Sequence, residues 1–96
     1  MVSLEPFIIN VLGTASRFVK ISVAIELGNE KAVEHTKKMT PVIRDRMLTV
    51  LGAKPPEVFM DLNGRSAVKK ELSDGVSGLF KDKDFKGVYI TDIIMQ

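Results

Sequence analysis

The sequence contains no cysteine and only one histidine among its 96 residues. The absence of cysteine excludes disulfides, thiol nucleophiles and cysteine-ligated zinc. A single histidine forms part of a zinc site only where carboxylates supply most of the other ligands. His35 lies on the flank of a stripe of apolar residues at helical spacing, so we interpret it as a residue at the boundary of the core. We predict no metal and no other cofactor.

Long hydrophobic runs are also lacking. No segment approaches the roughly 20 consecutive apolar residues that a membrane-spanning helix needs. The first residues, "MVSLEPFIINVLG", have no basic region, and Glu5 and Pro6 precede only a short apolar stretch, which is not the pattern of a signal peptide. We therefore expect a soluble chain without a targeting segment. The composition is equally compatible with a piece of a longer protein.

Charge of one sign is not concentrated in any long segment. The 14 basic and 12 acidic side chains leave a net charge of +2, and the segment "KDKDFK" alternates in sign. This distribution is only a weak indication of nucleic acid or anionic lipid as a partner. Phe18, Lys20 and Tyr89 faintly resemble the aromatic and basic side chains on which some sheets stack RNA bases. A small basic nucleic-acid-binding module is therefore the alternative to our main prediction, which includes no nucleic-acid partner.

The clearest positive signal is a strand pattern. Residues 17–27, "RFVKISVAIEL", alternate between apolar and wetter side chains, which predicts a strand with one buried face. Residues 7–12, "FIINVL", predict a first strand, and "GTAS" between the two predicts a hairpin turn that makes the pair antiparallel. The last nine residues, "VYITDIIMQ", predict a final strand.

Helical spacing of the apolar residues begins after the long strand. Asn29 is predicted to cap a helix over residues 30–51. Its apolar stripe consists of Ala32, Thr36, Met39, Ile43, Met47 and Val50. Pro41 interrupts this pattern, because it lacks a backbone donor and crowds the preceding turn. Either one helix kinks there, or two helices meet with Thr40 as the cap and Pro41 in the first turn.

A second long helix is predicted over residues 65–80. Residues 52–63 before it predict a turn followed by a short helix or an irregular docked segment, and Asn63 and Gly64 are predicted to separate that segment from the helix. Gly75 lies on the apolar stripe of the helix. It either weakens the end of the helix or lets the helix lie close against the sheet, and we predict the close packing.

The order strand, strand, helix, helix, strand predicts one α+β domain over residues 1–96. The last strand is apolar on both faces, so we expect it to pair with residues 17–27 and to complete a small antiparallel or mixed sheet. The helices are predicted to pack on one face of this sheet.

No arrangement of side chains predicts catalysis. The serines have no nucleophile-elbow context, and "GVSG" falls inside a helical stripe. Asp82 and Asp84 are flanked by lysines in a loop and are interpreted as solvated charges. The chain is therefore predicted not to be an enzyme.

Asp92 is the one carboxylate within the apolar terminal strand. We predict that it shares a face with Val88, Ile90 and Ile94. A structural ion pair with Lys20 or Arg17 on the neighbouring strand would then be worth roughly 0.2–1 kcal/mol.

Four blocks of sequence together resemble the C-terminal domain of the flagellar basal-body protein family FliL. They are "LEPFIINV", "RFVKISVAIEL", "TPVIRDRMLTVLGAK", and "NGRSAVKKEL" leading to "VYITDIIMQ", and they extend over residues 4–96. In FliL-like proteins the last block has a tyrosine, a threonine, an acidic residue and a final glutamine, and Tyr89, Thr91, Asp92 and Gln96 match these places. The segments "GAKPPEVFM" and "DGVSGLF" depart from the usual pattern of the family.

This resemblance implies a function that the residues alone do not give. It implies the periplasmic domain of a single-pass inner-membrane protein, similar to the stomatin/SPFH domain, without its membrane segment. It further implies a domain with no enzymatic activity that forms homo-oligomers, including rings, and assists the ion-driven stator units of the flagellar motor. A stomatin-like scaffold without a flagellar role is a further alternative.

Self-association is predicted to use the first helix of this domain. Lys37, Arg44, Arg46 and Leu48 adjoin its apolar stripe, and arginine can bridge carboxylates bidentately across a contact. The short first strand is predicted to be an unpaired edge of the sheet. The domain on its own is expected to be monomeric or weakly oligomeric in dilute solution.

Overall fold

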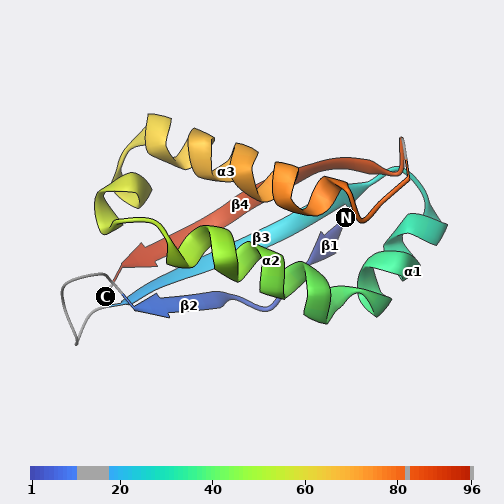
Figure 1. Cartoon of the computed structure of the whole chain (residues 1–96), viewed down its shortest axis with the longest axis horizontal. Coiled ribbons are helices and arrows are strands. Elements are labelled where there is room, and N and C mark those ends of the chain that lie inside the picture. Colours follow the sequence, from blue (N-terminus) through green and yellow to red (C-terminus); the bar gives the residue numbers. More distant parts are fainter. Residues whose placement is uncertain (11–17, 82, 96) are drawn as a thin grey trace.

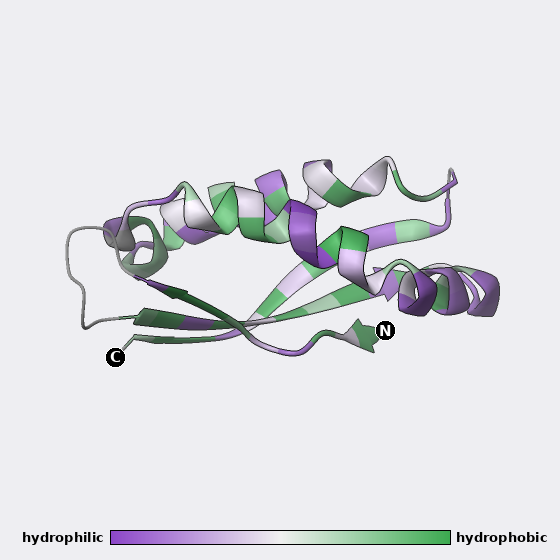
Figure 2. Cartoon of the chain, turned by 60° about the horizontal axis from the view of Figure 1, so that its bottom comes forward, coloured by the Kyte–Doolittle hydropathy of each residue, from purple (hydrophilic) through white to green (hydrophobic). Residues whose placement is uncertain are grey.

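A computed structural model of the chain describes residues 1–10, 18–81 and 83–95. The elements in chain order are β1 (Val2–Ser3), β2 (Phe7–Asn10), β3 (Phe18–Leu27), α1 (Glu30–Lys38), α2 (Thr40–Gly52), the 3-10 helix η1 (Pro56–Met60), α3 (Leu62–Ser77) and β4 (Phe85–Met95). Helices α2 and α3 lie side by side over one face of the sheet, and α1 lies beyond one end of it (Figure 1). Figure 2 shows the two layers edge-on, with none of the described helices on the second face of the sheet. The predicted α+β fold with helices on one face is confirmed.

The sheet is antiparallel and is organised around β3. Strands β1 and β2 pair with β3 along one of its edges, with Val2 opposite Ile25 and Phe7 opposite Ile21. Strand β4 pairs with the other edge of β3 over its whole length. The predicted pairing of the terminal strand with the long strand is therefore confirmed. The predicted "GTAS" turn, Arg17 and the end of the first strand lie outside the described residues.

The core lies between the sheet and the two long helices. The alternation in β3 places Val19, Ile21, Val23 and Ile25 on the helix side, and each is at most 2% exposed. The helices contribute Ile43, Met47 and Leu51 from α2, and Val68, Leu72 and Val76 from α3. Full burial of such an aliphatic side chain stabilises the fold by about 1.5–3 kcal/mol. Elements that are far apart in the sequence are thereby held in one hydrophobic cluster.

Pro41 separates two helices rather than kinking one. Helix α1 ends at Lys38, α2 begins at Thr40, and Met39 lies between them. The prediction that Thr40 is the N-cap is wrong, because Met39 holds that position and the Thr40 hydroxyl donates backwards, to the carbonyls of Thr36 and Lys37, both at 3.1 Å. Pro41 occupies the first turn of α2, where a missing backbone donor costs nothing.

The cap of α1 agrees with the sequence. The side-chain oxygen of Asn29 accepts a hydrogen bond from the Ala32 amide at 2.9 Å, as predicted. The Asn29 side-chain amide also donates to the Asp84 carboxylate at 2.8 Å. One residue therefore both starts the helix and fixes the loop before β4.

Helix α3 begins earlier than predicted. Asp61 is its N-cap and accepts from the Gly64 amide at 3.3 Å, so Asn63 and Gly64 lie inside the first turn rather than before it. A Cβ atom at position 64 would collide with the backbone of Val58 in η1. Glycine is thus needed here because two backbones approach closely. The short helix that was one of the two predictions for this region is η1.

Gly75 does not have the role predicted for it. A Cβ atom there would meet only Cγ2 of Val50, at 3.8 Å, which is an ordinary van der Waals contact. Val50 belongs to α2, so this position faces the neighbouring helix and not the sheet. The prediction that Gly75 brings α3 close against the sheet is therefore wrong, because the space is sufficient for a side-chain carbon.

Candidate protein-interaction surfaces

His35 fixes the corner where α1 meets the end of α3. Its Nε2–H donates to the carbonyl of Leu79 at 2.9 Å, and its ring packs edge-on against Phe80 at 5.5 Å between centroids. Phe80 in turn stacks on Phe85 at the start of β4. These contacts account for the single histidine as a structural residue at the core boundary. Among the described residues, no group of histidine, aspartate and glutamate side chains could hold a metal ion.

Asp92 lies on a different face from the one predicted. A β-bulge shifts the register between β3 and β4, so that Ser22 pairs with Asp92 whereas Val23 pairs with Ile90. The extra residue between them, Thr91, reverses the alternation. Asp92 is consequently exposed and does not share a face with Val88 and Ile90, which are directed toward the core, although it still shares one with Ile94.

The predicted ion pair of Asp92 is not formed with the described candidate. The described residues form two ion pairs, Lys54 with Glu71 at 2.6 Å and Lys70 with Asp74 at 3.6 Å, and neither includes Asp92 or Lys20. Lys20 instead lies half-buried between the neighbouring strands, opposite Ile8 and Ile94. Arg17, the other candidate partner, lies outside the described residues. A structural role for Asp92 therefore stays a prediction without a contact to support it.

Arg44 is bound within its own chain. Its guanidinium donates to the carbonyls of Glu5 at 2.6 Å and of Pro6 at 3.4 Å, and it lies 4.2 Å from the centre of the Phe7 ring. These contacts connect α2 to the segment between β1 and β2. Because Pro6 has no backbone N–H and the pairing is interrupted there, Arg44 holds an otherwise weak part of the sheet edge. Arg44 is thus a structural residue in this chain, whatever other contact it makes.

The other three predicted interface residues do not form one surface with Arg44. Arg46 is directed to the opposite side of α2 and donates to the carbonyl of Gly75 in α3 at 3.3 Å. Lys37 is exposed on α1. Leu48 is 43% exposed and lies one turn after Arg44, on the side of α2 nearer to β2. Of the predicted set, Leu48 offers the apolar surface that an interface core requires.

The open face of the sheet carries two exposed isoleucines, one on β2 and one on β4, with a lysine of β3 between them. Ile8 in β2 pairs with Lys20 in β3, which pairs with Ile94 in β4, and the two isoleucines are 64% and 46% exposed. Further along this face, the Tyr89 hydroxyl donates to the Glu26 carboxylate at 2.7 Å. This hydrogen bond, together with the negative charge of Glu26, raises the pKa of Tyr89 above its ordinary value.

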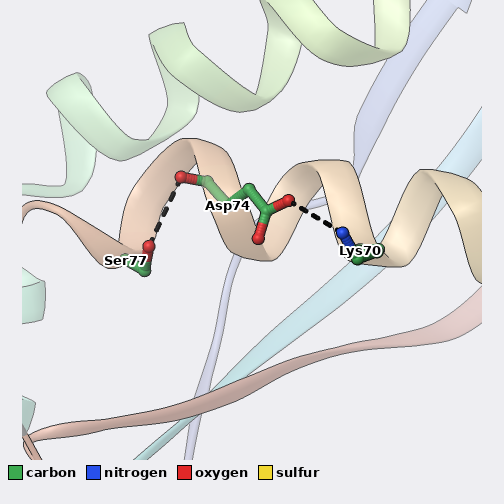
Figure 3. Close-up of polar contacts among 3 residues, drawn as sticks. All are labelled: Lys70, Asp74 and Ser77. Carbon is green, nitrogen blue, oxygen red and sulfur yellow. Dashed lines mark hydrogen bonds and ion pairs between the residues drawn. The ribbon is translucent and has the colours of Figure 1, made fainter.

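A groove runs between α3 and the outer edge of β4, which pairs with no strand among the residues that the structure describes. It consists of two hollows of about 440 and 470 Å³, which share Ser66 and Lys69 from the first half of α3. Arg65 lines the first hollow, and Lys86 lines the second. Lys70 and Asp74 of the second hollow pair with each other at 3.6 Å, and the Ser77 hydroxyl donates to the Asp74 carbonyl at 3.4 Å (Figure 3).

The sequence did not single out Lys69, Glu26 or Gly64 for these roles. Alternation in β3 does place Glu26 on the outer face, so its contact with Tyr89 becomes predictable once the strand register is known. Lys69 and Gly64 act through contacts with other elements, β4 and η1, and their spacing within α3 gives no signal of those contacts.

Together these features define a small α+β fold whose chemistry lies in exposed apolar side chains, a strand edge without a described partner strand, and a charged groove. Among the helices that the structure describes, none combines the length and the apolar character needed to cross a membrane. The family model "Flagellar basal body-associated protein FliL" matches residues 1–96. The chain therefore belongs to the FliL family of flagellar basal-body proteins, as its sequence blocks predicted.

A curated relative supports this family. The chain is 26% identical over 92 residues to "Flagellar protein FliL" of Aquifex aeolicus (strain VF5). This similarity covers 95% of the chain and 57% of that relative. The chain thus spans little more than half the length of the curated relative that it matches.

Proposed function

We propose that this chain is a non-enzymatic interaction domain of the flagellar basal body, which self-associates and assists the stator units of the motor. The observation that carries the proposal is the match of the FliL family over residues 1–96. The fold adds physical support, because its exposed apolar side chains and free strand edge are features of protein-binding surfaces.

The location that we propose is the periplasm, next to the inner membrane. In this proposal residues 1–96 form a single stomatin/SPFH-like domain, and a single membrane-spanning segment elsewhere in the full protein anchors it. The share of the curated relative that this chain covers, 57%, leaves room for such a segment. Anchoring would raise the local concentration of the domains and so favour weak contacts between them.

Self-association is proposed to use the side of the domain that carries β2. Leu48 on α2 and Ile8 on β2 are 43% and 64% exposed there. Arg44 lies between the two layers on this side and is already bound to Glu5 and Pro6. A test that reverses the charge of Arg44 would therefore disturb the fold as well as a contact, and Leu48 is the cleaner position to change.

Leu48→Asp in the full-length protein tests this proposal. We expect the purified variant to lose concentration-dependent self-association in sedimentation or light scattering. In flagellated cells we expect fewer stator units per motor, counted as stepwise changes in rotation speed. Met60→Asp is the matched control, because Met60 is 71% exposed but lies in η1 and lines neither hollow beside β4. Self-association of the Leu48 variant at wild-type affinity would contradict the proposed surface. A normal number of stator units in cells that lack this protein altogether would contradict the proposed function.

Nucleic-acid binding is not proposed, because the open face of the sheet carries carboxylates beside its aromatic side chains. Glu26 is hydrogen-bonded to Tyr89, and Asp92 is exposed on β4. Both would repel a phosphate backbone at the place where bases would have to stack.

A further inference from the structure

Strand β4 leaves one of its edges without a partner strand in the described part of the chain. It is an 11-residue strand, and its described pairing is with β3 alone. An edge of this length presents a row of unpaired backbone N–H and C=O groups, to which another extended segment can add. Helix α3 runs beside β4 (Figure 1). It forms the wall of the groove described above.

Lys69 crosses this edge. It belongs to α3, on the helix side of the sheet, yet its ammonium group lies 4.6 Å from the centre of the Tyr89 ring. Tyr89 is exposed and adjoins the buried Val88, so its ring projects from the opposite face. The Lys69 side chain must therefore pass over the β4 edge between the two hollows. A flexible lysine of this kind can move aside for a ligand or pair with one.

The charges of the groove are predominantly positive. Arg65, Lys69 and Lys86 line it, and Lys70 is paired with Asp74. The remaining carboxylate of the lining is Asp92, in the first hollow. At the end of that hollow Leu62, 77% exposed, offers an apolar contact.

We propose that the groove between α3 and the outer edge of β4 binds an extended, acidic segment of another protein, which adds to the sheet as a strand beside β4. Backbone hydrogen bonds to β4 would hold the segment, and its carboxylates would pair with Lys69, Lys86 and Arg65. A second copy of this chain is disfavoured as the occupant, because pairing β4 with its own symmetry mate would bring these cations together.

The inference deepens the proposed function and rests on it for the idea that the domain acts by binding other proteins. It concerns a different side of the domain from the self-association surface at Leu48. If only the groove proposal is wrong, peptide binding fails while the self-association and stator experiments give the expected results. If only the self-association proposal is wrong, the Leu48 experiments fail while the peptide still binds to the groove.

The experiment uses the 96-residue chain labelled with nitrogen-15 and a synthetic peptide of about ten residues, in which valine and threonine alternate with glutamate. We expect amide shifts confined to β4 and α3 in the NMR spectrum, and weaker binding at high salt. The same peptide with lysine in place of glutamate should bind at least about tenfold more weakly. Shifts along β1 and β2, or no shifts at millimolar peptide, would overturn the proposal.

Two substitutions of Lys69, to glutamate and to alanine, test whether this lysine binds the ligand or only blocks the β4 edge. Lys69→Glu should weaken the glutamate peptide about tenfold and improve the lysine peptide. Lys31→Glu is the matched control, since Lys31 is exposed on α1 away from the groove, and it should leave both affinities unchanged. If Lys69→Ala instead makes the chain associate with itself through β4 without any peptide, Lys69 only guards the edge and the proposal is wrong.

Discussion

The two outer edges of the sheet differ in how side chains cover them. Along one edge β1 and β2 pair with β3, and the pairing is interrupted between them. Arg44 stabilises the connecting segment by hydrogen bonds to Glu5 and Pro6 and by a contact with Phe7. Along the other edge β4 extends over 11 residues, and one lysine side chain from α3 crosses it. One edge is thus short and tied by several contacts, whereas the other is long and lightly covered.

This difference indicates which edge can exchange its contacts for those of a partner. Displacing Arg44 would break two charge-assisted hydrogen bonds and a cation–π contact, which together stabilise the fold by a few kcal/mol. Displacing Lys69 removes one exposed cation–π contact, worth about 0.5–1 kcal/mol. The β4 edge is therefore the one where the cost of opening is small compared with what an added strand supplies.

The largest expected effect concerns the start of the helix that forms the wall of the β4 groove. Gly64→Ala should destabilise the chain by about 3 kcal/mol, because its Cβ would collide with the backbone of Val58. Gly78→Ala is the control, since no atom lies within 4 Å of a Cβ there. Chemical denaturation of both variants measures the difference. Equal denaturation midpoints for the Gly64 and Gly78 variants would mean that η1 does not lie against the first turn of α3.

The next largest loss of stability is expected at Arg44, which holds the segment between β1 and β2. Arg44→Ala should cost about 2 kcal/mol, through loss of the hydrogen bonds to Glu5 and Pro6 and of the packing on Phe7. Arg46→Ala should cost about 0.5 kcal/mol or less, because its single bond to the Gly75 carbonyl is exposed. Denaturant titrations of the two variants compare them directly. If Arg46 proves the more costly loss, the assignment of Arg44 as the fastening residue fails.

A smaller and opposite effect is expected at the contact between α2 and α3. Gly75→Ala should stabilise the chain by up to about 1 kcal/mol, because alanine favours the helix and its Cβ has room against Val50. The melting temperature measured by circular dichroism should rise. A fall would restore the interpretation of Gly75 as a close-packing residue.

The smallest expected effect concerns the titration of Tyr89, on the open face of the sheet. Folding raises the pKa of Tyr89 above its ordinary value of 10.0, first through the hydrogen bond to Glu26 and then through the charge of Glu26. The neutral phenol is thus favoured in the folded state, so this contribution to stability is complete below about pH 10 and is lost as the pH rises through the raised pKa. Tyr89 is the one tyrosine of the chain, which makes its ultraviolet titration unambiguous. Glu26→Gln should lower the measured pKa, and an unchanged pKa would show that the hydrogen bond is not formed in solution.

Local signals in the sequence predicted what depends on neighbouring residues. The alternation of residues 17–27, the cap at Asn29 and the break at Pro41 all predicted the correct elements. The face of Asp92 was not predictable, because the bulge at Thr91 arises from the register of two strands far apart in sequence. Gly64 was interpreted as a separator because the close approach of the Val58 backbone depends on how η1 packs against α3, which no local pattern indicates.

The candidate surfaces follow the same division. Leu48 and its exposure could be anticipated from helical periodicity, whereas the contact of Arg44 with Glu5 joins residues 39 positions apart. The β4 groove needs the packing of α3 beside a strand that follows it in the chain, and no pattern within either element indicates the charge that gathers between them.

Photo-crosslinking in flagellated cells tests most directly the claim that the two sides of the domain meet different partners. A photo-reactive amino acid replaces either Ser66, which is exposed and lines both hollows of the β4 groove, or Leu48 on the opposite side, in the full-length protein. The account predicts that position 66 forms adducts with a different flagellar protein, and that position 48 forms adducts with a second copy of the same chain. Adducts of position 66 with a second copy alone, or of position 48 with the other flagellar protein alone, would contradict it.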